Sequence, residues 1–107
     1  MEKQCIAVPG ISEMLEKSKI PLSPAVRAGD FVFVSGMPPI DRETGELIKG
    51  DIAAQTEQVL ENVKACLEAA GSSLDKVVKC NVYAANSGYF NAVNEVYARY
   101  FSHNPPA

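Results

Sequence analysis

Residues 25–36 decide the fold, and they read Ala25-Val26-Arg27-Ala28-Gly29-Asp30-Phe31-Val32-Phe33-Val34-Ser35-Gly36. Two short runs of β-forming residues flank a Gly-Asp turn, which is the pattern of a β-hairpin. The second run is apolar at every position from 31 to 34, so we expect it in the middle of a covered sheet rather than at an edge. The sequence therefore predicts strand structure over residues 25–35 on either side of one tight turn.

Two other stretches have the character of strands. Residues 3–8 form a short, largely apolar run that Pro9-Gly10 closes. Residues 77–83 alternate, with Val78, Cys80 and Val82 on one face, as a half-buried strand does. We expect both to join the hairpin in one sheet. The intervening segment 11–19 is ambiguous, because its apolar spacing fits one helical face but prolines follow directly.

Two amphipathic helices are predicted, near residues 52–70 and 88–101, from apolar residues that recur at three- and four-residue steps. Asp51 is a suitable N-cap for the first helix, and Gly71 a suitable left-handed terminator. We expect both helices on the same face of the sheet. The predicted fold class is α+β, a two-layer sandwich of helices on a sheet.

Composition limits the possible functions of this 107-residue chain, whose length suits the single domain 1–107. Its net charge is −3 and its basic residues are scattered, so no basic stripe points to nucleic acid. Apolar runs are too short to span a membrane and no signal peptide is visible, so we expect a cytoplasmic protein without a membrane partner. Cys5, Cys66 and Cys80 lack metal-site or disulfide spacing, so neither a metal nor a disulfide is expected.

Three stretches, residues 28–36, 44–71 and 77–107, resemble the Rid family, the YjgF-like imine and enamine deaminases formerly called L-PSP endoribonucleases. The resemblance implies a chorismate-mutase-like fold with a mixed sheet, a homotrimer with ligand sites between subunits, and no metal or organic cofactor. It also implies hydrolysis of small imino or enamino acids, such as 2-iminopropionate, to the keto acid and ammonia. Some family members were described as ribonucleases or translation inhibitors, a role that the acidic composition disfavours here.

Five residues match the family's substrate-binding site by position, and they are Leu22, Ser35, Gly36, Phe90 and Asn94. The family commonly has a tyrosine where Leu22 stands, so we expect the substrate to differ. Ser35 and Gly36 equally fit a strand that ends in a glycine turn. Asn94 equally fits a helix surface, and Phe90 fits the apolar core better than a pocket. The sequence identifies no catalytic residue.

In the family, Pro-Ala is followed by an arginine that grips the substrate carboxylate and then by two strands. Here Ala107 is the last residue, so we expect a truncated domain that is poorly folded alone and inactive towards imines. Arg27, Arg42 and Arg99 are interpreted as solvated surface charges, with Arg99 paired to Glu95 four residues earlier. The alternative function is therefore a non-catalytic trimer of the same fold that binds a small metabolite or a protein.

Overall fold

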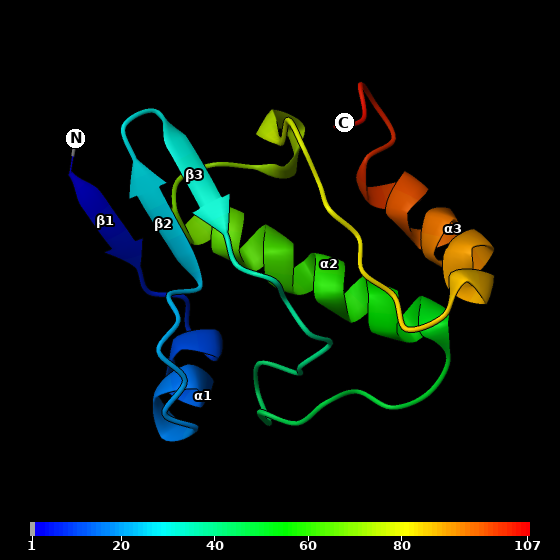
Figure 1. Cartoon of the computed structure of the whole chain (residues 1–107), viewed down its shortest axis with the longest axis horizontal. Coiled ribbons are helices and arrows are strands. Elements are labelled where there is room, and N and C mark those ends of the chain that lie inside the picture. The colour runs from blue at the N-terminus through cyan, green and yellow to red at the C-terminus, as the bar shows by residue number, and fades with distance from the viewer. Residues whose placement is uncertain (1) are drawn as a thin grey trace.

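The computed structural model describes residues 2–107 and has two layers, a small sheet and a pair of packed helices (Figure 1). A third, shorter helix covers one end of the sheet. The elements follow in the order β1 (Lys3–Ile6), α1 (Ile11–Lys17), β2 (Ala25–Ala28), β3 (Phe31–Val34), α2 (Ile52–Ala69), the 3₁₀ turns η1 (Leu74–Lys76) and η2 (Ser87–Tyr89), and α3 (Phe90–Tyr100).

The predicted hairpin is confirmed as β2 and β3, which pair antiparallel with Ala28 opposite Phe31. Gly29 in the turn has a φ of 59°, in the left-handed region that glycine adopts without steric cost. β1 pairs antiparallel with the other edge of β2, so the strand order is β1-β2-β3. The stretch 11–19, ambiguous in the sequence, forms helix α1, which buries Ile11 and Leu15.

The expected position of residues 31–34 in the middle of the sheet is wrong, because β3 is an edge strand in the part of the chain described. Val32 and Val34 pack against the core, whereas Phe31 and Phe33 are 63% and 62% exposed. Apolar residues at every position indicate burial on both faces, but the helices cover only one. The outer face of β3 is left as exposed aromatic surface.

The strand expected over residues 77–83 is also wrong. This segment joins no strand of the sheet, and two of its backbone groups instead pair with the chain end. Cys80 N–H donates to the Ala107 carbonyl at 2.8 Å, and Ala107 N–H donates to the Val78 carbonyl at 3.0 Å. Alternation predicts which side chains share a face, but a strand needs a neighbouring strand to pair with. The sheet is therefore wholly antiparallel rather than mixed.

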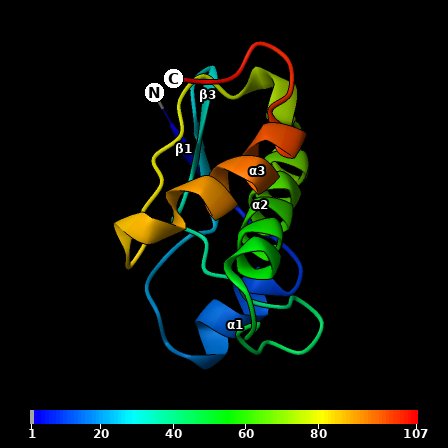
Figure 2. The same cartoon turned by 90° about the vertical axis from the view of Figure 1, so that its right-hand side faces the viewer.

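Both long helices are confirmed; α2 packs beside the sheet, and α3 packs against α2 (Figure 2). Asp51 caps α2 by accepting a hydrogen bond from Ala54 N–H at 2.7 Å, and Gly71 ends it with a φ of 80°. One core cluster joins α2 to the sheet and α1 around Val8 and Cys66. A second joins α2 to α3 around Leu60 and Val96.

Asn62, 1% exposed, is the one buried polar side chain among residues 2–107, and it holds the connection from β3 to α2. Its amide donates to the carbonyls of Pro38 at 3.0 Å and Ile40 at 2.9 Å. Its carbonyl accepts from the Gln58 amide at 2.9 Å. All the bonds are satisfied inside the protein, so Asn62 fixes residues 36–40 against the middle of α2.

Replacing Asn62 by leucine should lower the free energy of unfolding by about 1–3 kcal/mol, because the buried Ile40 carbonyl loses its donor and the Pro38 carbonyl keeps only the Ile40 N–H. Asn91→Ala, on the exposed face of α3, is the matched control and should stay within about 0.5 kcal/mol of the parent. Urea unfolding followed by circular dichroism measures both. Equal losses for the two variants would show that Asn62 does not anchor the loop.

Candidate functional site

A cavity of about 170 Å³ lies where α1, the segment after it, and the loop after β3 converge on α2. It brings together Leu22 and Gly36, two of the residues that sequence comparison with the family singled out. The other lining residues are Ile11, Met14, Leu15, Ile20, Met37, Pro38, Ile40 and Asn62. The cavity wall is therefore apolar except for Asn62.

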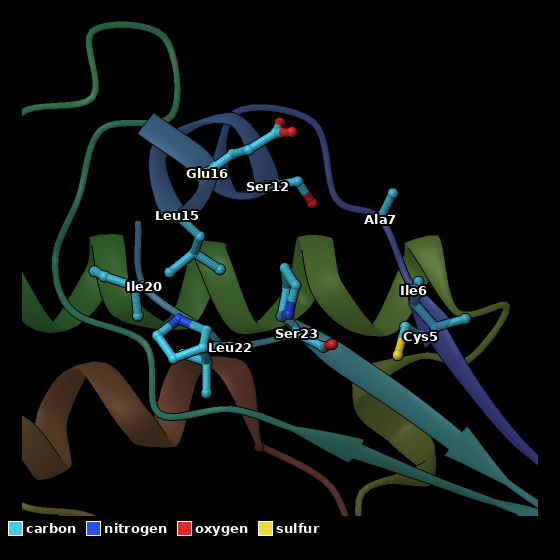
Figure 3. A pocket seen from close by; sticks show the side chains of 11 residues that line it. Cys5, Ile6, Ala7, Ser12, Leu15, Glu16, Ile20, Leu22 and Ser23 are labelled. Carbon is cyan, nitrogen blue, oxygen red and sulfur yellow. The ribbon is translucent and has the colours of Figure 1, made fainter. Parts of the chain in front are cut away.

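A larger and more open cavity, of about 480 Å³, lies on the other side of Leu15, Ile20 and Leu22, which line both (Figure 3). It carries more polar groups, including Ser12 and Glu16 of α1 and the thiol-bearing Cys5 of β1. The Ser12 hydroxyl already accepts a hydrogen bond from Val8 N–H at 2.8 Å. Leu22 thus separates an apolar cavity from a partly polar one.

Ser35 joins the end of β3 to the segment that carries Leu22. Its hydroxyl donates to the Ser23 carbonyl, and its N–H donates to the Pro24 carbonyl at 3.0 Å. The hydroxyl therefore has a structural partner, and Ser35 itself lines neither cavity. Gly36 is exposed, and a methyl group built on its Cα would meet no heavy atom within 4 Å, so its backbone faces open space.

Phe90 and Asn94 lie elsewhere, on α3, and line neither cavity. Phe90 is 68% exposed, so the interpretation of this residue as core is wrong. It is the first residue of α3, directly after the 3₁₀ turn η2, and α2 does not cover it there. Asn94 is exposed on the next turn of the same helix. The structure therefore brings Leu22, Ser35 and Gly36 together within one subunit and leaves Phe90 and Asn94 on a separate surface.

Two of the three arginines have partners that the sequence did not predict. Arg27, interpreted as a solvated charge, donates from Nη2 to the Ala70 carbonyl at the end of α2, where a cation also suits the helix dipole. Arg99 lies 3.8 Å from the Glu57 carboxylate on α2 rather than pairing with Glu95. Arg42 is exposed on the loop and does not line either cavity.

The cysteines occupy different environments. Cys66 is fully buried, its sulfur 3.8 Å from that of Met37, and burial raises the pKa of its thiol to about 11 against a smaller lowering by Arg42. This confirms its interpretation as a buried hydrophobe rather than a nucleophile. His103 is exposed near the chain end. Across residues 2–107, no three potential ligands among His, Cys, Asp and Glu gather closely enough to hold a metal ion.

Sequence reasoning missed the contribution of α1 to the cavity. Ile11, Met14 and Leu15 line it together, and their spacing of three and four residues was the available signal. Their orientation towards Gly36 depends on how α1 packs against the loop after β3, which no local pattern specifies.

None of the helices in the described part of the chain has the length and apolar character needed to cross a membrane.

The chain is similar to one protein family and to many known proteins. A family model described as Endoribonuclease L-PSP matches residues 14–107. A RutC family protein of Pyrococcus horikoshii is 55% identical over 87 residues, covering 81% of this chain and 69% of that protein. Reactive Intermediate Deaminase A, chloroplastic, of Arabidopsis thaliana is 40% identical over 87 residues, covering 81% of this chain and 46% of that protein.

Solved structures agree in fold. RidA from the Antarctic bacterium Psychrobacter superimposes with a TM-score of 0.77 at 46% identity, covering 81% of this chain and 70% of that one. The yeast protein YEO7 superimposes with a TM-score of 0.85 at 35% identity, covering 98% of this chain and 81% of that one.

Thiol reactivity should separate the cysteines in the native protein. At pH 8, a pKa of about 11 leaves about one thiolate per thousand Cys66 side chains, before burial further blocks access. We expect iodoacetamide to label exposed Cys5 at least about a hundredfold faster than Cys66, and the Cys66 rate to rise as the pH approaches its pKa. Mass spectrometry of the labelled peptides measures both rates. In urea the two should react alike, and equal rates in the native state would contradict the buried placement of Cys66.

Proposed function

Since the chain belongs to the endoribonuclease L-PSP family, which includes RutC and Rid proteins, we propose that its complete form hydrolyses small reactive imino or enamino acids to keto acids and ammonia. The observation that carries the proposal is the meeting of Leu22 and Gly36 at one cavity, beside the hydrogen bond from Ser35 to Ser23, in a chain similar to a plant protein named Reactive Intermediate Deaminase. Residues 1–107 would form the larger part of one such domain, in the cytoplasm.

The chemistry sets two requirements. An imino acid presents a carboxylate, which a guanidinium binds best with two parallel hydrogen bonds. It also presents an electrophilic carbon, which a positioned water attacks while a nearby group moves the proton. The exposed backbone of Gly36 offers room for the reacting part of the ligand beside the cavity.

The carboxylate partner is the part of this mechanism that residues 2–107 do not provide at the cavity. Arg27 is bound to the end of α2, Arg99 faces Glu57, and Arg42 lies outside the cavity lining. We therefore assign this role to an arginine beyond these three, as the family resemblance implies.

Exposed apolar surface supports assembly into a homotrimer. Four large apolar side chains are between 57% and 74% exposed: Phe31 and Phe33 on β3, and Val78 and Val82 in the segment 77–83. Apolar surface of this kind on a small protein marks an interaction site. We propose that subunits meet across the outer face of the sheet, with an interface that borders Ser35, Gly36 and Asn94.

A non-catalytic trimer that binds a small metabolite is the second candidate, favoured by Leu22 in place of the family's tyrosine and by the engaged arginines. Ribonuclease activity is third, since the net charge of −3 opposes contact with phosphate.

The test of hydrolysis is the release of keto acid from freshly generated imine. Protein expressed from its complete reading frame should exceed the rate in buffer, and residues 1–107 alone should not. Gly36→Val should lower the rate at least about tenfold, because its side chain extends into the space beside the cavity, where an added Cβ meets no heavy atom within 4 Å. Leu47→Asn, an exposed loop variant outside the lining of both cavities, should match the parent. Keto-acid binding without hydrolysis would favour the metabolite-binding alternative.

Light scattering at micromolar concentration tests the assembly, again with protein from the complete reading frame. We expect the mass of three subunits. Phe33→Lys should shift the equilibrium towards monomer by at least about tenfold, since it places a charge in an apolar interface. The exposed variant Glu43→Lys serves as the control for added positive charge. A monomer at all concentrations for the parent protein would contradict the trimer.

A further inference from the structure

The 170 Å³ cavity beside Gly36 is lined almost entirely by apolar side chains. Ile11, Met14 and Leu15 enter from α1, and Met37 and Ile40 from the loop after β3. Figure 3 shows Leu15 beneath α1 near Ile20 and Leu22, the three residues that this cavity shares with its larger neighbour. Within this lining there is no charged residue.

Asn62 is the one polar side chain in the lining, and its hydrogen bonds are already used. Its amide donates to two loop carbonyls, and its side-chain oxygen accepts from Gln58. A carboxylate or ammonium entering the cavity would therefore lose its hydration without gaining a partner, which is strongly unfavourable. Whatever part of a ligand enters the cavity must be uncharged and apolar.

The open side of the cavity has a different character. Leu22 is 47% exposed, and Gly36 presents its backbone to open space. A ligand can therefore keep its polar atoms at Gly36, in contact with water, while its apolar end lies among Leu22, Met14 and Met37. The volume of 170 Å³ equals that of about six liquid waters, which suits a branched aliphatic or thioether side chain.

We propose that this cavity binds the side chain of the ligand, and that the protein prefers imino acids derived from leucine, isoleucine and methionine over the imine of alanine. The identity of the ligand as an imino acid rests on the proposed function, whereas the apolar preference rests on the cavity. Leu22 is the specificity-determining residue, because its half-exposed side chain lines the cavity. It adds apolar contact where the family commonly has a phenol.

Binding of two product keto acids tests the preference without depending on turnover. The keto acid of leucine and pyruvate both carry the carboxylate and carbonyl, and they differ only in the aliphatic group. Protein from the complete reading frame is titrated with each, and NMR follows the methyl signals of Ile11 and Met14 and the Gly36 amide. We expect the keto acid of leucine to bind at least about tenfold more tightly, as a hydrophobic pocket discriminates between side chains that differ by a few methyl groups.

Leu22→Asn should reduce that preference to about threefold or less, because it places an amide at the boundary of the cavity. The variant is expected to fold, since Leu22 is half exposed. Leu47→Asn makes the same substitution at a leucine that is 59% exposed and lies outside the cavity lining, and should leave the preference unchanged.

Equal affinities for the two keto acids, binding of neither, or signal changes away from Ile11 and Met14 would each overturn the proposal. Imine hydrolysis is measured separately on the same preparations. Tight binding of the keto acid of leucine without hydrolysis would uphold the cavity's role and reject the deaminase function. Hydrolysis with no side-chain preference would uphold the deaminase function and reject the cavity's role.

Discussion

The hydrogen bonds of Asn62 are the constraint on which the rest of this structure depends. A long loop between an edge strand and a helix has many conformations, and ordering it costs entropy at every residue. One buried amide, bonded to the carbonyls of Pro38 and Ile40, selects one of them and places the loop on the middle of α2. Because the bond to Ile40 forms away from water, losing the donor would leave the buried Ile40 carbonyl unsatisfied. The loop is therefore held in place by polar bonds within an apolar surrounding.

The position of α1 follows from that loop. Gly10, at the start of α1, has a φ of 87°, and a Cβ there would lie 2.6 Å from the Arg42 carbonyl oxygen. Only glycine allows this approach, so the start of α1 lies directly on the loop that Asn62 anchors. Ile11 and Leu15 then turn into the core, and Met14 completes the wall of the smaller cavity. The cavity is thus a product of two loop contacts rather than of any single element.

The same architecture leaves one side of the sheet uncovered. Within residues 2–107, α2 packs on one face of the sheet, α3 packs on α2, and β3 is paired only with β2. Phe31 and Phe33 on the other face have no helix to cover them, although their residue types are those of a buried strand. An apolar strand at an exposed edge invites association with other chains. The mismatch between composition and exposure is the physical basis for expecting partner subunits at this face.

Local signals in the sequence determined the hairpin and both long helices. The Gly29-Asp30 turn, the Asp51 cap and the Gly71 terminator act within a few residues, so their effects follow from the sequence alone. The periodicity of residues 52–69 likewise identifies the face that packs, and Cys66 lies on it as expected. Family motifs added the candidates Leu22, Ser35 and Gly36, which the structure brings to one place.

Tertiary structure alone decided the contacts between residues far apart in the chain. Residues 77–83 alternate like a strand, yet strand pairing depends on a neighbour that periodicity does not supply. Arg27 reaches Ala70, and Arg99 faces Glu57 instead of the Glu95 next to it on α3, because helix packing brings those partners closer. The separation of Phe90 and Asn94 from Gly36, and the apolar cavity itself, arise from the relative placement of α1, α3 and the loop. That placement depends on packing and on one buried amide, neither of which leaves a local pattern in the sequence.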